Sequence, residues 1–373
     1  MTLTKINRDK AGTDTALNAA LSNGVYLGNV TIKTVGASSD ITISNTRVST
    51  DKAGAFYISN NANTLTIESG RDIIVTDTGD LSTAGSMTLR AGRDIEFKSS
   101  PTQKAKLNFN GAATARFTAG DAGGIKIGTN VEFTATNTDA VDFVLNAGYI
   151  DANGVFAARK ISGDVKALTN AATATHATVY FKKLKGIGGS VNVTITDFVV
   201  VRGNLKVEGM DGSGLLNIGA EVTIPAQPDL TTGLQVNGAA AGGLGAVDEF
   251  DIDIKTDLAT LKVNGLLKGS KAKLTASSIV SDNGGLQVVN ALTMFGTSTL
   301  GQISLSRIDS SKTKIKSVTA ANNMSLTYDS AVTLDGLSVV MQNTPANRIM
   351  KITTNTGTID FGANGLTLNG GVG

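Results

Sequence analysis

Short segments of alternating hydrophobic and polar residues run along most of the chain. Examples are VTIK at residues 30–33, DITI at residues 40–43 and KLNF at residues 106–109, with Gly, Asn or Asp at the joints between segments. Alternation with a period of two is typical of a β-strand that buries one face. Strands of four or five residues are not stable alone, so the pattern predicts a fold in which many strands support one another.

One unit of this pattern occurs twice with nearly the same sequence. Residues 64–75 read TLTIESGRDIIV and residues 86–97 read SMTLRAGRDIEF, 22 positions later, and each copy is a strand, a glycine corner and a second strand. A repeat of about 20 residues predicts a solenoid, because coiling stacks equivalent strands in parallel. Ile67 and Leu89 should then lie one above the other inside, and parallel crossovers are nearly always right-handed. The predicted fold is an all-β, right-handed parallel β-helix.

The expected organisation is a single β-helical segment over residues 1–373, with one helical candidate near its start. Within residues 13–27, Thr13 or Asp14 could cap a short helix and Gly24 could end it. The last residues still read as strand, corner and strand, without the polar cap that a solenoid end normally carries. We therefore expect the sequence to be a piece of a longer secreted protein, with Met1 added for expression.

Residues 211–250 break the regular pattern. They contain Pro225 and Pro228 and the Gly/Ala-rich run at residues 237–245. Proline removes a donor from the strand ladder, and Gly and Ala lack side chains for a stacked core. The segment predicts a loop or flap that leaves the β-helix, and an irregular coil is the alternative interpretation.

Composition and charge narrow the classes of function. A net charge of +2 gives no global field for nucleic acid or membrane surfaces, and the absence of Cys removes disulfides and thiolate metal sites. No apolar run approaches the ~18 residues of a membrane helix. His176 is the only histidine, and no nucleophile or orienting carboxylate is evident beside it. We expect a monomer without a catalytic site, a cofactor, a nucleic-acid partner or a membrane span.

An acidic segment offers a candidate metal site. The sequence DEFDIDI at residues 248–254 places Glu249, Asp251 and Asp253 on one face of a strand. Three carboxylates in a row could hold Ca²⁺ through oxygen ligands. The pattern is unspecific, because such a face is more often simply solvated, and the main expectation is that the chain holds no metal.

A basic segment offers a candidate receptor site. The sequence YFKKLKG at residues 180–186 follows an Arg-Lys pair about one coil earlier. Basic groups beside aromatic rings can bind anionic glycans, with charge for the acid group and a ring face for the sugar. The alternative is a set of solvated lysines that keep a sheet edge from pairing. The candidate receptor-binding residues are Arg159, Lys160, Tyr180, Lys182, Lys183 and Lys185.

Three glycosylation sequons begin at Asn29, Asn192 and Asn323. In a chain so rich in Ser and Thr, three sequons are no more than chance would give. The sequence contains no glycine-rich phosphate-binding motif, because the glycines at residues 186–189 are followed by a strand rather than a helix.

The doubled GRDI phrase resembles the repeats of the filamentous haemagglutinin family, which includes the high-molecular-weight adhesins of Haemophilus. The resemblance covers about residues 6–100. It is carried by SGRDI and AGRDI at residues 69–73 and 91–95, and by LNAAL, NG, VTI and DITI at residues 17–21, 23–24, 30–32 and 40–43.

This resemblance implies a β-helical exoprotein of a bacterial pathogen. Family members leave the cell by two-partner secretion through an outer-membrane transporter, lie on the bacterial surface or outside it, and attach to host cells, often through surface glycans. No Asn-Pro motif of the family's secretion domain occurs here, so the resemblance points to an interior passenger segment. In the Haemophilus branch sequons carry simple hexoses, which would give Asn29, Asn192 and Asn323 a role.

The main hypothesis is a non-catalytic adhesin segment that binds a host receptor, a glycan or a glycoprotein, from a rigid β-helix. One alternative is a polysaccharide lyase or glycoside hydrolase on the same scaffold, which would need clustered carboxylates, or a basic residue with Ca²⁺, in a groove. Another is a pure structural spacer. Carboxylates are scattered and Trp is absent, which favours binding over catalysis. The less regular residues 159–257 are the expected place for a site.

Overall fold

A computed structural model describes most of the chain as strands joined by turns. The described residues are 25–26, 29–34, 36–44, 56–58, 64–83, 85–109, 113–135, 141–166, 179–187, 191–201, 203–219, 233–237, 252–282, 285–342 and 348–370. They contain strands and no helix, and the helix predicted to start at Thr13 or Asp14 lies outside them. Two compact units, Met1–Ser190 and Val191–Gly373, are each described by themselves. The described residues include no helix long and apolar enough to cross a membrane.

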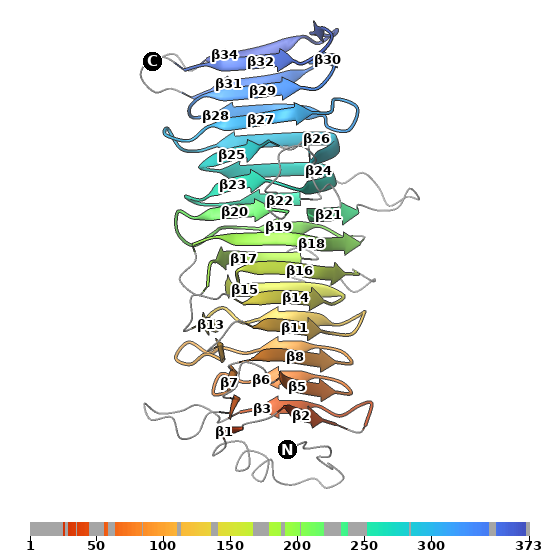
Figure 1. The fold of residues 1–373 in the computed structure, drawn as a ribbon, viewed down its shortest axis with the longest axis vertical. Coiled ribbons are helices and arrows are strands. Elements are labelled where there is room, and N and C mark those ends of the chain that lie inside the picture. Colours follow the sequence, from red (N-terminus) through yellow and green to blue (C-terminus); the bar gives the residue numbers. More distant parts are fainter. Residues whose placement is uncertain are drawn as a thin grey trace. The chain divides into compact units, whose positions relative to one another are not determined.

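In the first unit the coils form three stacks of parallel strands (Figure 1). The first stack is β2 (Val30–Lys33), β5 (Thr64–Ser69), β8 (Ser86–Ala91), β11 (Thr114–Thr118), β14 (Asp142–Asn146) and β16 (Lys160–Val165). The second is β3 (Ile41–Ile43), β6 (Ile73–Val75), β9 (Ile95–Phe97), β12 (Gly124–Ile127), β15 (Tyr149–Ala157) and β17 (Val179–Lys185). The third is β1 (Val25–Tyr26), β4 (Phe56–Ile58), β7 (Asp80–Thr83), β10 (Lys106–Phe109) and β13 (Glu132–Ala135). Three parallel stacks, with one strand of each per turn of chain as far as β13, are the architecture of a parallel β-helix.

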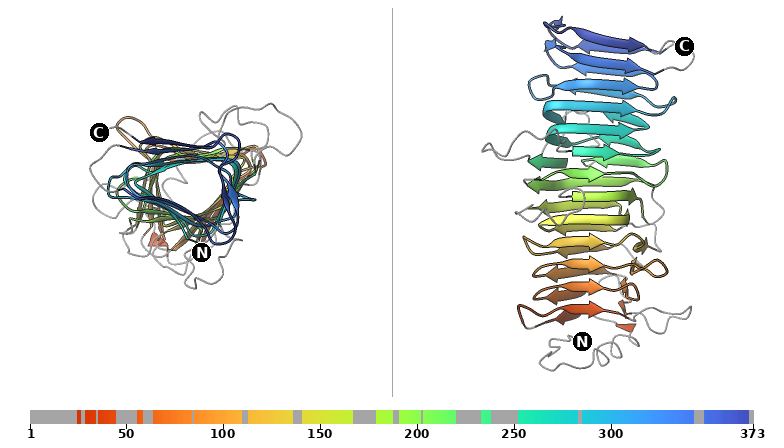
Figure 2. Two further views of the ribbon diagram at one scale, coloured as in Figure 1. Left: turned by 90° about the horizontal axis from the view of Figure 1, so that it is seen from above. Right: turned by 180° about the vertical axis from the view of Figure 1, so that it is seen from behind.

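The second unit repeats this architecture, and the view from above in Figure 2 shows its strands along the sides of each coil. One stack contains the first half of β18 (Val193–Val201), then β20 (Leu215–Ile218), β23 (Thr260–Val263), β25 (Ser278–Ser281), β27 (Ile303–Ile308), β29 (Met324–Tyr328) and β32 (Met350–Thr354). Another contains β19 (Leu205–Val207), β22 (Ile252–Lys255), β24 (Leu266–Ala276), β26 (Leu286–Gly296), β28 (Ile315–Ala320), β31 (Leu337–Met341) and β34 (Leu366–Gly370). The remaining strands are β21 (Gly233–Asn237), which pairs with β18 and β24, and the pair β30 (Val332–Thr333) and β33 (Ile359–Asp360).

The register of the doubled repeat confirms the predicted stacking. Ile67 pairs with Leu89, and both side chains are 0% exposed. The 22-residue spacing, however, does not apply to the other coils, so the doubled repeat gives the length of one coil only. Hydrogen-bonded positions on neighbouring coils lie 35 residues apart at Asn29 and Thr64 and 18 apart at Asn146 and Asp164. The strands keep their stacking while the turns between them change in length, because the ladder constrains only the strands.

Phenylalanines fill the interior of the first unit. Phe97, Phe117, Phe143, Phe156 and Phe181 are all 0% exposed, and the centroids of consecutive rings along this series lie between 5.0 and 5.5 Å apart. Tilted and edge-to-face rings at this spacing add about 1 kcal/mol each beyond the apolar area that they bury. Several of the few aromatic residues of the chain therefore fill the core of the first unit.

The GRDI corners form a ladder of ion pairs from coil to coil. Arg71 binds Asp40 of the preceding coil, and Arg93 binds Asp72 in the same way through two guanidinium nitrogens. The carboxylate of Asp72 also accepts the backbone N–H of Asp94 at 3.0 Å. Each Asp thus joins its own corner to the next one, and the hydrogen bond from Arg71 holds the pKa of Asp40 below its usual value.

The described part of residues 211–250 belongs to the stacks. β20 pairs with β18 and β23, and β21 pairs with β18 and β24. Residues 220–232 and 238–251, which include both prolines, lie outside the described residues. The segment therefore supplies two strands, and the excursion between them stays a prediction.

Tyr328 makes the second unit sensitive to alkali. Burial raises the pKa of its hydroxyl to about 12, and the residue is 2% exposed. Between pH 10 and 12 the unfolded chain ionises at this position while the folded chain does not, so stability present below pH 10 is lost as the pH rises. We expect the unfolding free energy of Tyr328→Phe to fall less between pH 9 and pH 11 than that of the wild type, by about 1 kcal/mol. Equal losses in denaturant titrations of the two proteins would contradict this assignment.

Candidate functional site

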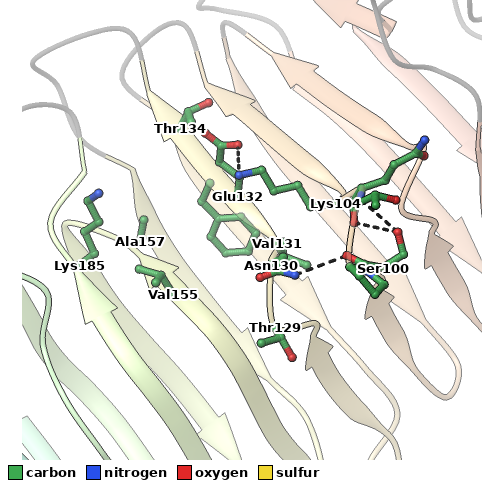
Figure 3. Close-up of a pocket in the computed structure, with 14 residues that line it drawn as sticks. Ser100, Lys104, Thr129, Asn130, Val131, Glu132, Thr134, Val155, Ala157 and Lys185 are labelled. Carbon is green, nitrogen blue, oxygen red and sulfur yellow. Dashed lines mark hydrogen bonds and ion pairs between the residues drawn. The ribbon is translucent and has the colours of Figure 1, made fainter.

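A groove on the outside of the first unit lies where the third strand stack ends. Its volume is about 570 Å³, and Figure 3 shows its lining residues. β13 pairs only with β10 among the described strands, and the neighbouring coil presents Val155 and Ala157 of β15, which pair with β17 and not with β13. The groove therefore results from a break in the repeat, and β15 has a register shift just before Val155.

One wall of the groove is a tight loop between β9 and β10. Ser99 and Lys104 form an isolated antiparallel bridge, and the backbone N–H of Ser100 donates to the carbonyl of Gln103 at 2.7 Å. The backbone N–H of Asn130, one coil later, donates to the hydroxyl of Ser99 at 3.2 Å. These hydrogen bonds hold the loop against the coil that carries β13, so this wall of the groove has a fixed position.

Charged side chains lie on two sides of the groove. Lys104 Nζ lies 2.9 Å from a carboxylate oxygen of Glu132, and both side chains are about two-fifths exposed, at 42% and 37%. The hydrogen bond from Lys104 holds the pKa of Glu132 below its ordinary value, with further lowering by the charges of Lys106 and Lys185. Lys185 lines the opposite side in Figure 3. Among the described residues, the lining of the groove therefore combines one carboxylate with two ammonium groups.

The structure brings only part of the predicted basic segment to this groove. Lys182 and Lys185 are exposed, and Lys183 is half-exposed and pairs in register with Val155 on the groove side. Tyr180 is 2% exposed, so its ring has no free face for a sugar. The alternation of the segment fails at this point, because Tyr180 and Phe181 are both buried although they are consecutive.

The Arg-Lys pair lies at the turn between β15 and β16. Arg159 donates to both carboxylate oxygens of Asp142, at 2.8 and 2.9 Å, and its guanidinium is half-exposed. Lys160 begins β16 and pairs in register with Asp142. The backbone N–H of Ala158 donates to the carbonyl of Lys185 at 2.9 Å, which places this turn beside the end of β17. Arg159 is thus engaged by a neighbouring coil, which fits a structural role at the corner.

Sequence reasoning missed Lys104 and Glu132. Lys104 follows a Pro-containing turn and Glu132 begins an ordinary strand, and neither stretch has a sequence pattern typical of a binding site. The two side chains meet only because the two coils stack. The available signal was the Lys104–Ala–Lys106 run at the start of an alternating strand.

The three sequons share a structural role that their sequence pattern does not reveal. The side-chain oxygens of Asn29, Asn192 and Asn323 accept backbone N–H groups of the following coil, from Thr64, Leu215 and Ile349, at 2.9, 3.1 and 2.9 Å respectively. Each asparagine satisfies a donor at or next to the start of a strand, where the ladder has not yet begun.

We expect Asn323→Ala to lower the unfolding free energy by about 1 kcal/mol, because the N–H of Ile349 loses its acceptor. Asn323→Asp keeps an acceptor at the same place and serves as the matched control. Denaturant titration followed by circular dichroism measures both. Equal stabilities of the alanine and aspartate variants would show that this hydrogen bond does not matter.

The candidate calcium residues are only partly placed. Glu249, Asp251 and also His176 lie outside the described residues. Asp253 lies on β22, half-buried, and burial raises the pKa of its carboxyl in spite of the opposing charges of Lys273 and Lys206. Within the described ranges, no three His, Cys, Asp or Glu side chains come together as a metal site. The calcium hypothesis therefore has no geometric support in this part of the chain.

Comparison of the chain with protein families, curated proteins and solved structures finds no match.

Proposed function

We propose that the chain is a β-helical segment of a secreted bacterial adhesin, and that it binds a glycan or glycoprotein on host cells through the groove beside β13. The observation that carries the proposal is the groove itself, where Lys104 pairs with Glu132 and Lys185 lines another side, on a scaffold of stacked strands. The resemblance of residues 6–100 to the filamentous haemagglutinin family adds support. On this proposal the full-length protein leaves the cell through an outer-membrane transporter of the two-partner pathway.

The charges in the groove favour binding over hydrolysis. Glycoside hydrolases use a pair of carboxyl groups, one of them with a raised pKa so that it can donate a proton. Glu132 is the only carboxylate among the described residues that line the groove, and its pKa is shifted in the opposite direction. A carboxylate held ionised by Lys104 suits recognition, and it does not suit general acid catalysis.

Binding to cultured host epithelial cells tests the proposal. Fluorescently labelled protein should bind saturably, and the double variant Lys104→Met/Lys185→Met should lose most of that binding. The control is Lys98→Met/Lys166→Met, which removes two exposed lysines of the same unit that pair with Glu96 and Asp121. Absence of saturable binding to several cell types would overturn the proposal, and release of reducing sugar from host polysaccharides would favour the enzyme.

A further inference from the structure

The four most exposed large apolar side chains among the described residues lie at one corner of the second unit. This corner precedes each strand of the stack that runs from β18 to β32 (Figure 1). The residues are Val191, Leu258, Leu300 and Ile349, which are 61%, 68%, 94% and 62% exposed. A single exposed aliphatic residue is ordinary, but a line of them along one edge is typical of an interaction surface.

Three of these side chains are evenly spaced along the corner. β23, β25, β27, β29 and β32 follow one another in the stack, and Leu258, Leu300 and Ile349 come shortly before β23, β27 and β32. Leu300 is therefore two coils from each of the other two residues, about 10 Å in each direction at the usual strand spacing. The coils between them present the short polar side chains of Ser277 and Asn322.

Opposite charges accompany the two outer apolar residues. Asp257 directly precedes Leu258, and Arg348 directly precedes Ile349. Asp257 is exposed and Arg348 is half-exposed, and both also interact within their own chain. The corner is thus apolar along its length, with a carboxylate beside one outer residue and a guanidinium beside the other.

We propose that this corner, defined by Leu258, Leu300 and Ile349, is a self-association surface on which two copies of the chain pack antiparallel. A two-fold axis at Leu300 places this residue against its equivalent and Leu258 against the partner's Ile349. The same axis brings Asp257 opposite the partner's Arg348, and it does so twice, because a two-fold interface is isologous. The inference goes beyond the proposed adhesin, does not involve the groove beside β13, and replaces the monomer expected from the sequence.

Other packings of this corner satisfy its features less well. In a parallel pair of chains Asp257 would face Asp257 and Arg348 would face Arg348, and like charges across an interface weaken binding. An unrelated apolar partner would cover the three side chains but would not require their even spacing or the opposite charges. Lys255 of β22 and Lys351 of β32 lie on the two sides of the coil that meet at this corner (Figure 2), so they stay at the rim of the antiparallel contact.

The small size of the contact predicts a weak dimer. A stable interface uses about 20–30 residues from each partner, and the corner supplies far fewer. We expect a dissociation constant on the order of 100 μM, so the dimer should form reversibly at high concentrations of the protein.

Disulfide trapping tests both the contact and its orientation, because the chain contains no Cys. Leu300→Cys should cross-link with itself under mild oxidation, since the axis brings the two thiols together. Leu258→Cys and Ile349→Cys should cross-link when the two variants are mixed, and much more slowly when each is alone. Val289→Cys is the matched control, because Val289 is 58% exposed in the same unit but lies within β26, away from the corner.

Sedimentation velocity of the full chain measures the dimer itself. We expect Leu300→Asp to raise the dissociation constant at least about tenfold, because each copy then places a carboxylate at the axis. Asp257→Arg and Arg348→Asp should each weaken the dimer, and the double variant Asp257→Arg/Arg348→Asp should recover it. Circular dichroism checks that every variant is folded.

Four results would each overturn the inference. The first is a wild type that stays monomeric at about 1 mM. The second is trapping of Leu300→Cys no faster than that of Val289→Cys, and the third is trapping of Leu258→Cys with itself rather than with Ile349→Cys. The fourth is loss of host-cell binding by Leu300→Asp while the wild type is monomeric, which would assign the corner to a different partner.

Discussion

Gly92→Ala is expected to lower the unfolding free energy of the first unit by about 3 kcal/mol, or to prevent its folding. A methyl group at this position would overlap the carbonyl oxygen of Gly70 and lie 2.9 Å from its carbon, both in the backbone of the preceding coil. The backbone there cannot easily withdraw, because the N–H of Gly92 donates to the carbonyl of Ser69 at 3.0 Å. Stacked coils bring their corners so close that only glycine fits.

Gly36→Ala is the matched control for this effect. Its added methyl group would meet the Oγ of Ser39 at 2.7 Å, an atom at the end of a side chain that can rotate, and no other heavy atom closer than 3.9 Å. Hydrogen exchange of peptides from residues 64–100 measures the local effect without assuming that the whole chain unfolds in one step. Similar protection in Gly92→Ala and Gly36→Ala would contradict the close approach of the corners.

Asp72→Ala is expected to destabilise the same corners by about 2 kcal/mol. The substitution leaves the N–H of Asp94 without an acceptor and removes the acceptor of the charged guanidinium of Arg93. Asp72 is 4% exposed, whereas its partner Arg93 is half-exposed, so water compensates the arginine far better than the buried backbone group. Asp72→Asn keeps an oxygen that can accept the N–H at 3.0 Å and should recover about half of the loss.

Denaturant titrations of the wild type and both Asp72 variants, combined with hydrogen exchange at residues 92–97, measure this contribution. If Asp72→Asn were as unstable as Asp72→Ala, the ion pair with Arg93 rather than the backbone hydrogen bond would hold the corner. If neither variant lost stability, the ion pairs and hydrogen bonds at the corners would not contribute to the stability of the stacked coils.

The alternation of short strands, together with one repeat of 22 residues, was sufficient to predict a parallel β-helix. Ile67 and Leu89 stack inside as their matching positions in the repeat require, since the side-chain period of a strand leaves no other face for them. Coil length was not predictable from one repeat, because the turns between strands can lengthen without disturbing the ladder, as in the coil that separates Asn29 from Thr64 by 35 residues. The doubled phrase describes one pair of coils and is not a measure for the chain.

The site was less predictable than the scaffold. Lys185 was recognised from a local run of charges, but its counterparts Lys104 and Glu132 lie far from it in sequence and reach it through the stacking of coils. The neighbouring lysines make Tyr180 a candidate in the sequence, but the structure buries it in a run of three buried residues, Val179, Tyr180 and Phe181. Local patterns identify charged surfaces, whereas the register between coils decides which of them share a groove.

Lysine-selective acetylation, read by mass spectrometry with and without host-cell membranes, tests the central claim most directly. If the groove beside β13 is the receptor site, Lys104 and Lys185 should be protected when membranes are present, while Lys98 and Lys166 should react equally in both samples. Protection that appears only at other lysines, or that is absent from Lys104 and Lys185 under conditions where the protein binds the membranes, would contradict the account.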